Sequence, residues 1–159
     1  MIFCKITGAL VLLLSGILLA SHLNGALAQK RRQAAAVEEW LRFLRGQIDC
    51  FSMPLSDIMI LSGIDTLAAC GYTADIMPND FAEFLERSEI YDSDIEGALT
   101  ELGASFGGCY REEQLRACDR CIDAVASRRE RIASEMPKRR KLNATLCVSA
   151  ALAAAILLV

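Results

Sequence analysis

An apolar segment stands at each end of this 159-residue chain, and these two segments limit what the chain can fold into. Residues 6–20 are almost purely apolar, and weakly polar residues extend this segment to about Ala28. The last segment, 142–159, has no charged residue. A helix needs roughly 20 apolar residues to cross a bilayer, so the sequence predicts transmembrane helices over 1–28 and 142–159. About 110 residues remain, which suits one small domain over 29–141.

Basic residues border both apolar segments on the side that faces the middle of the chain. Residues 30–32 are Lys-Arg-Arg, and residues 138–141 are Lys-Arg-Arg-Lys. Basic residues beside a span tend to stay in the cytoplasm, so both clusters predict a bacterial membrane protein with a cytoplasmic middle domain. A signal peptide is the alternative interpretation, because the Ala-Leu-Ala of residues 26–28 resembles a cleavage site. Cleavage would give an exported helical binding domain that the last helix tethers to the membrane.

Apolar residues in the middle region recur at spacings of three and four, which is typical of amphipathic helices. No stretch alternates with a period of two for long enough to predict a strand. The sequence therefore predicts an all-α fold, a small helical bundle domain flanked by an N-terminal and a C-terminal transmembrane helix. The expected helices of the domain cover about residues 33–50, 55–70, 81–90, 94–106 and 111–136. The apolar face of the first consists of Val37, Trp40, Leu41, Leu44 and Ile48.

Proline, glycine and helix-capping residues indicate where these helices are expected to begin and end. No Pro or Gly stands within residues 26–45, so the first amphipathic helix is expected to continue directly from the first apolar segment. Ser52 is expected to cap the second helix, and Gly71 is expected to end it. Ser93 and Glu96 form a capping-box pattern at the start of the fourth helix.

Charge is distributed unevenly along the chain. The net charge of −3, from 17 basic and 20 acidic residues, argues against a nucleic-acid-binding protein. The region from Asp49 to Glu113 holds fourteen acidic residues but only Arg87 and Arg111 as bases. Such a region is either a solvated acidic face or a docking surface for a basic partner. The candidate partner-binding residues are Arg42, Arg45, Glu83, Glu86, Glu89 and Asp92.

The cysteines give the nearest approach to a chemical motif. Cys118 and Cys121 have the spacing of a redox or zinc-binding pair, and Cys109 could add a third ligand. No second pair of this kind exists, and the only histidine, His22, lies in the first apolar segment. Seven cysteines without regular spacing are a poor disulfide framework, so we expect reduced thiols in the core. We therefore expect no enzyme, cofactor or metal site, with a thiol redox or metal protein as the alternative.

Several short motifs follow one another between the apolar ends. A helix ends in Gln-Ile, a Pro-Leu pair follows, and a Leu-Gly pair precedes a long charged helix that contains Gln. These residues are Gln47, Ile48, Pro54, Leu55, Leu102, Gly103 and Gln114. In this order and spacing, over nearly its whole length, the chain resembles the stage III sporulation protein AB family of endospore-forming bacteria. It departs from the family pattern at Cys50 and Phe51, where Tyr-Gly is usual.

The resemblance implies a non-enzymatic platform or scaffold in the membrane complex between mother cell and forespore. Members of this family resemble the platform proteins of type II secretion and type IV pilus systems. The implied partners are a cytoplasmic secretion-type ATPase and other membrane proteins of the complex, and such a role is compatible with homo-oligomers. The implied location is the mother-cell membrane around the forespore.

Overall fold

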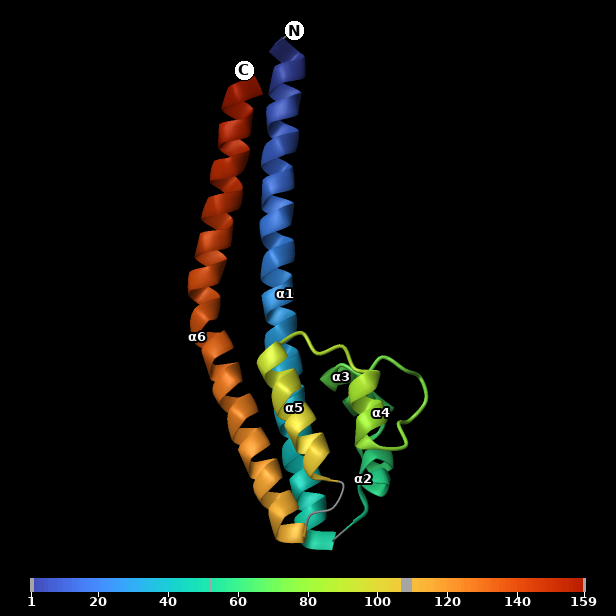
Figure 1. Ribbon diagram of the computed structural model, residues 1–159. Coiled ribbons are helices and arrows are strands. Elements are labelled where there is room, and N and C mark those ends of the chain that lie inside the picture. The colour runs from blue at the N-terminus through green and yellow to red at the C-terminus, as the bar shows by residue number, and fades with distance from the viewer. Residues whose placement is uncertain (1, 52, 107–109, 159) are drawn as a thin grey trace. The chain divides into compact units, whose positions relative to one another are not determined.

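The computed structural model describes residues 2–51, 53–106 and 110–158, with side chains given from residue 11 to residue 153 except 12, 13 and 151. Within these ranges the chain forms six helices and no strand (Figure 1). The helices are α1 (Ile2–Phe51), α2 (Leu55–Ser62), α3 (Ile64–Cys70), α4 (Phe81–Glu86), α5 (Ser93–Ser105) and α6 (Arg111–Leu158). The predicted all-α class is confirmed.

The chain divides into two compact units, and α1 and α6 each contribute to both. We call Met1–Gln29 together with Ile132–Val159 the terminal unit. We call Lys30–Arg131 the central domain. The uninterrupted α1 confirms the prediction that the first amphipathic helix continues from the first apolar segment.

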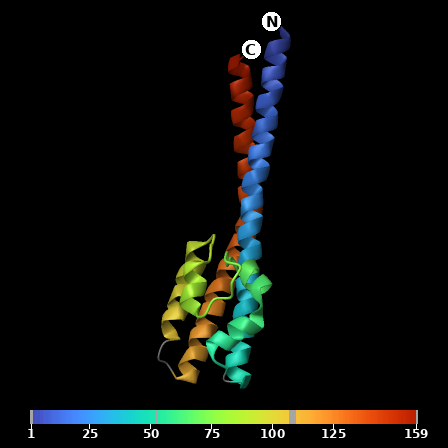
Figure 2. The ribbon, with the colours of Figure 1, turned by 90° about the vertical axis from the view of Figure 1, so that its right-hand side faces the viewer.

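The terminal unit consists of the first part of α1 and the last part of α6, which lie side by side with both chain ends at the same end (Figures 1 and 2). Gly16 and Ala20, one turn apart on α1, are buried. Larger apolar side chains of the same helix are exposed, among them Leu14 at 52% and Leu18 at 69%. Gly16 and Ala20 are thus enclosed in this unit, whereas Leu14 and Leu18 face outward.

The described residues contain no helix that combines the length and the apolar character needed to cross a membrane. The predicted transmembrane helices over 1–28 and 142–159 are therefore not supported by them. Residues 1–10, 12, 13, 151 and 154–159 lie outside the described side chains. Less than half of each predicted span falls on those residues.

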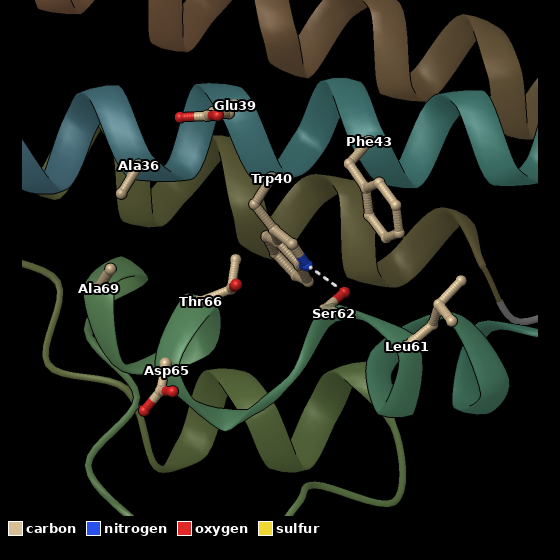
Figure 3. Close-up of a pocket in the computed structure, with 9 residues that line it drawn as sticks. All are labelled: Ala36, Glu39, Trp40, Phe43, Leu61, Ser62, Asp65, Thr66 and Ala69. Carbon is tan, nitrogen blue, oxygen red and sulfur yellow. Dashed lines mark hydrogen bonds between the residues drawn. The ribbon is translucent and has the colours of Figure 1, made fainter.

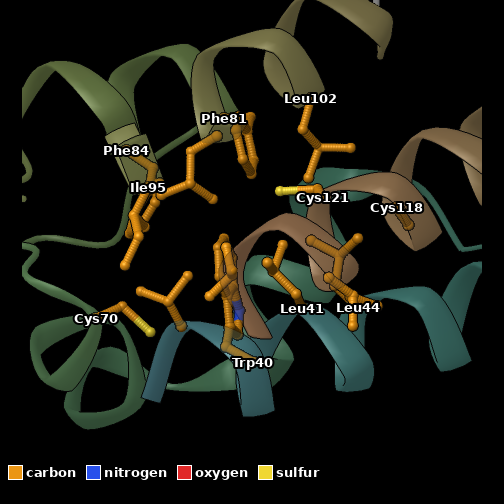
Figure 4. Packing of buried hydrophobic residues seen from close by; sticks show 14 of the residues in the cluster. Trp40, Leu41, Leu44, Cys70, Phe81, Phe84, Ile95, Leu102, Cys118 and Cys121 are labelled. Carbon is orange, nitrogen blue, oxygen red and sulfur yellow. The ribbon is translucent and has the colours of Figure 1, made fainter. Parts of the chain in front are cut away.

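The core of the central domain forms around the predicted apolar face of α1. Val37, Trp40, Leu41, Leu44 and Ile48 are all at most 5% exposed, which confirms that prediction. The Trp40 ring lies 4.8 Å from Phe84 and stacks on Phe81 of α4 at 5.9 Å between centroids (Figure 4). Each large apolar side chain buried in this way stabilises the fold by roughly 1.5–3 kcal/mol. The other helices add Ile58, Met59, Leu67, Cys70, Ile95, Leu99, Leu102, Ala117, Cys118, Cys121, Ile122 and Val125.

The predicted second helix is in fact two helices, because the chain turns sharply at Gly63. This glycine has φ 76° and ψ 150°, a conformation that is essentially confined to glycine. The periodicity of the apolar residues continues through residues 55–70 and so hid the break. The turn places Ser62 where its hydroxyl donates to the Ile58 carbonyl oxygen at 2.8 Å and accepts from the Trp40 indole N–H at 3.0 Å.

The helix ends confirm one predicted cap and correct another. Gly71 ends α3 in the left-handed region, at φ 113°, as predicted. The expected capping box at Ser93 and Glu96 is wrong, because Ser93 is already the first helical residue and Asp92 caps α5 by accepting from Asp94 N–H at 3.3 Å. The predicted third helix is also too long, since α4 ends at Glu86. Ser52, the expected cap of the second helix, lies outside the described residues.

Candidate docking surface

The two predicted arginines of α1 are held in ion pairs inside the central domain. The Arg42 guanidinium lies 2.8 Å from the carboxylate of Glu38, one turn earlier. Arg45 donates from Nε to Asp119 Oδ1 on α6 at 2.7 Å, and its Nη1 lies 3.2 Å from Asp49. These contacts raise the pKa of Arg45, chiefly through the hydrogen bond to Asp119. Arg45 therefore connects α1 to α6.

The predicted glutamates lie in α4 and in the segment after it. Glu83 accepts hydrogen bonds from the backbone and the side-chain N–H groups of Asn79, both at 2.8 Å. It also pairs with Arg87 at 3.1 Å. The backbone hydrogen bond from Asn79 is the main cause of the lowered pKa of Glu83. Glu86 and Glu89 have exposed side chains, so their carboxylates are accessible to a partner.

Asp92, the last predicted partner-binding residue, is buried and fully engaged. Its side chain is 5% exposed and accepts hydrogen bonds from Nε and Nη2 of Arg128, each at 2.9 Å. Burial alone would raise the pKa of Asp92, but the hydrogen bonds and charge of Arg128 and the N–H of Asp94 outweigh it, and the pKa is lowered. This carboxylate connects the start of α5 to α6 and is not free to meet a partner.

A buried amide holds the segment before α5 against α1. Gln33 is 6% exposed. Its Nε2 donates to the Glu89 carbonyl oxygen at 2.6 Å, and its Oε1 accepts from the Tyr91 N–H at 2.9 Å. Gly71 lies close by, because a Cβ there would come within 2.7 Å of the Glu89 carbonyl oxygen. The exposed Glu89 side chain is thus carried on a fixed backbone.

A second buried carboxylate, that of Glu38, pairs with an arginine that lies on α6 between the buried residues Val125 and Ile132. Glu38 is 4% exposed, and its Oε2 lies 3.1 Å from Nη1 of Arg129. Its Oε1 pairs with Arg42. Buried charges are tolerated when they are paired in this way. Arg129 is therefore a partner for α1 inside the domain.

The thiols are core residues. Cys118 and Cys121 are 0% and 4% exposed, which confirms their predicted packing role. Burial raises the pKa of Cys118 to about 11 and that of Cys121 to about 12. The thiolate is the reactive and metal-binding form, so these thiols are inert near neutral pH. Among the described residues no group of three or more His, Cys, Asp or Glu could hold a metal ion, and Cys109 lies outside them.

The central domain has a groove between α1 and the α2–α3 pair, with a volume of about 510 Å³ (Figure 3). The indole of Trp40 lies across its middle and donates to Ser62 from the opposite wall. Phe43 and Leu61 stand at one end of the groove, and Ala36 and Ala69 at the other. The full lining is Ala36, Glu39, Trp40, Phe43, Leu61, Ser62, Asp65, Thr66 and Ala69.

Sequence reasoning did not find this groove. Phe43 stands outside the predicted apolar face of α1, and it is 37% exposed. Leu61 falls in the apolar run of 55–70 and is 56% exposed. Phe43 and Leu61 are both large apolar residues at positions outside the periodic pattern that predicts the core, and this was the signal in the sequence. The groove itself depends on the turn at Gly63, which the periodicity does not reveal.

Comparison with known proteins gives one family. The family described as stage III sporulation protein AB matches residues 71–159, which include α4, α5 and α6. No curated protein and no solved structure gives a match. The matched region is more than half of the chain and contains the Leu102-Gly103 pair and Gln114 of the predicted motifs. The chain therefore belongs to the stage III sporulation protein AB family, as its sequence motifs predicted.

Proposed function

We propose that this protein is a non-enzymatic scaffold of the membrane complex that forms between mother cell and forespore during sporulation, and that it docks a cytoplasmic secretion-type ATPase. Membership of the stage III sporulation protein AB family is the observation that carries the proposal. The all-helical central domain suits a scaffold, because it offers a stable framework with exposed charged side chains.

The chemistry of the domain supports a role in binding. The polar groups that are most buried, Glu38, Asp92 and Gln33, connect helices or loops of the domain to one another. The thiols of Cys118 and Cys121 are buried and protonated near neutral pH. Each of these groups has a structural role, so we assign none of them to catalysis.

The terminal unit supports attachment to the membrane. Its exposed large apolar residues lie close together on α1 and recur on α6, and such surfaces in water mark sites of protein or lipid contact. The basic clusters 30–32 and 138–141 would meet anionic lipid headgroups at the cytoplasmic face. The exposed apolar residues are Val11, Leu14, Ile17, Leu18, Leu19, Leu23, Leu142, Leu146, Val148 and Leu152.

Deleting the gene in its endospore-forming host tests the sporulation role. We expect cells that reach engulfment but form few heat-resistant spores, with recovery when the full chain is supplied. Normal spore counts in the deletion strain would remove the proposal.

A second experiment tests the side of the membrane. Glu86→Cys adds an exposed thiol to the central domain, and the unaltered chain is the matched control for the native cysteines. We expect an impermeant thiol reagent to label the variant above the control only after the cells are permeabilised. Excess labelling in intact cells would favour the exported domain.

A third experiment tests the ATPase. The full chain in detergent, with a tag, is used to retain the purified secretion-type ATPase of the same host. Glu86→Lys with Glu89→Lys is expected to weaken retention, whereas Asp75→Lys with Glu130→Lys, which also reverses two exposed acids, is expected to leave it intact. No retention by the unaltered chain would exclude direct docking.

A further inference from the structure

The groove between α1 and the α2–α3 pair presents apolar surface that the domain itself does not cover. Trp40 is 1% exposed and forms its floor, so the floor is fixed by core packing. Phe43 and Leu61 project beside it and are 37% and 56% exposed. One interhelix hydrogen bond, from Trp40 to Ser62, crosses the groove at 3.0 Å. A rigid floor with exposed apolar walls is the usual form of a site that receives side chains from a partner.

The charge of the groove is one-sided. Glu39 from α1 and Asp65 from α3 both line it, and its lining contains no Lys, Arg or His. Among the described residues neither carboxylate forms an ion pair, in contrast to Glu38 and Asp92. A partner that brings positive charge would therefore meet two carboxylates without displacing an existing contact.

The length of the groove fits a short run of helix. On α1 it extends from Ala36 to Phe43, about 10 Å at the helical rise per residue. That distance is about two turns, so a docked helix could insert apolar side chains from positions i, i+3 or i+4, and i+7. Its flanking positions would then lie near Glu39 and Asp65.

We propose that this groove is the docking site for an amphipathic helix of another protein, with apolar side chains entering beside Trp40 and Lys or Arg side chains meeting Glu39 and Asp65. The inference deepens the proposed function by naming a partner-binding surface, and it rests on that function only in taking the protein to act by binding other proteins. The occupant is a basic amphipathic helix because the groove combines exposed apolar side chains with the carboxylates of Glu39 and Asp65, and no basic residue lines it.

Site-specific photo-crosslinking in the sporulating host tests the proposal on the full chain. Benzoylphenylalanine replaces Phe43 in one strain and Leu61 in a second, and exposed Asp123 on α6 carries it in the control strain. After irradiation, the crosslinked peptides are sequenced by mass spectrometry. We expect both groove positions, and not the control, to capture a segment of another protein with apolar residues at helical spacing beside Lys or Arg.

Charge reversal provides the second arm. Glu39→Lys with Asp65→Lys should lower the crosslink yield on the order of tenfold, because like charges then face each other. Asp75→Lys with Glu130→Lys is the matched control and should leave the yield unchanged. Asp65 lies in the first turn of α3, so the neutral pair Glu39→Gln with Asp65→Asn is made as well and should give an intermediate loss.

Four outcomes would overturn the proposal. These are no captured partner at either groove position, capture of a second copy of this chain or of lipid, equal capture at Asp123, and a yield that charge reversal does not change. The proposed function fails separately, because it falls when the gene deletion leaves spore counts normal. A deletion strain that lacks spores, combined with groove variants that crosslink to no partner, would keep the scaffold and remove only the groove.

Discussion

The two sides of α1 in the central domain differ in how they meet their neighbours. On the side toward α6, which we call the closed side, ion pairs accompany the apolar packing: Arg45 pairs with Asp119, and Glu38 pairs with Arg129. Toward α2 and α3, the indole of Trp40 donates a hydrogen bond to Ser62 across the space, and large apolar residues stay exposed. One helix thus has a side built for stability and a side that keeps surface available. The difference indicates which substitutions should affect folding and which should affect binding.

The largest effect on stability is expected from removing a core side chain on the side of α1 that packs toward α6. Leu44 is 0% exposed and points from α1 into the core (Figure 4). Leu44→Ala should lower the free energy of unfolding by about 3 kcal/mol, because it leaves a cavity between packed helices. Urea unfolding followed by circular dichroism measures the loss. A loss below about 1 kcal/mol would mean that this side is not tightly packed.

Removing the buried ion pair between the start of α5 and α6 should lower the free energy of unfolding somewhat less. Arg128→Ala leaves the carboxylate of Asp92 buried without its guanidinium partner, and we expect a loss of about 2 kcal/mol, since Arg128 itself is partly exposed. Asp92→Asn in the same background should recover part of the loss, because the uncompensated charge is gone.

The same pair predicts how stability changes with pH. The pKa of Asp92 is lower in the folded state than in the unfolded state. The Asp92 carboxylate therefore contributes fully to the free energy of unfolding above its unfolded-state pKa, and this contribution is lost as pH falls through its folded-state pKa. In acid, the gap in stability between the unaltered chain and Arg128→Ala should therefore narrow. Unfolding curves between neutral pH and strong acid measure it, and a gap that widens in acid would contradict the assignment.

A smaller effect on stability is expected from a substitution at Gly63, in the turn between α2 and α3 beside the groove. Gly63→Ala forces a side chain into a conformation that glycine alone adopts easily, at a cost of about 1–2 kcal/mol. A Cβ there would meet no atom within 4 Å, so any loss comes from the backbone and not from a clash. Gly97→Ala, a glycine inside α5 with equally open surroundings, is the control and should be neutral or stabilising.

The smallest effect on stability should come from the exposed wall of the groove. Leu61→Ser should change the free energy of unfolding by no more than about 0.5 kcal/mol, because Leu61 is already 56% exposed. The same substitution should reduce partner crosslinking from Phe43. If Leu61→Ser destabilised the domain as strongly as Leu44→Ala, the two sides of α1 would not differ in the way described.

The sequence predicts the parts of this fold that depend on local periodicity. The apolar face of α1, the left-handed end at Gly71 and the core positions of Cys118 and Cys121 all follow from spacing and residue type. The pairs of Glu38 with Arg129 and of Asp92 with Arg128 do not, because each joins residues far apart in the chain. The predicted partner-binding set mixed exposed Glu86 with buried Asp92 for the same reason.

The groove was beyond sequence reasoning for a different reason. An apolar periodicity that runs through residues 55–70 describes one straight helix equally well as two short ones. The choice is made by Gly63, whose backbone freedom has no signature other than the residue itself. Once the chain turns there, Ser62 and Leu61 take up positions that no window of sequence specifies.

Trp40 is the only tryptophan in the chain, and its position makes the protein its own optical reporter. The indole packs against Phe81 and Phe84 on the side of the core, and its N–H meets Ser62 at the groove. Unfolding would expose the ring to water and move its emission to longer wavelength. An occupant of the groove would change its intensity while the domain stays folded. A single chromophore thus separates the two events without any added label.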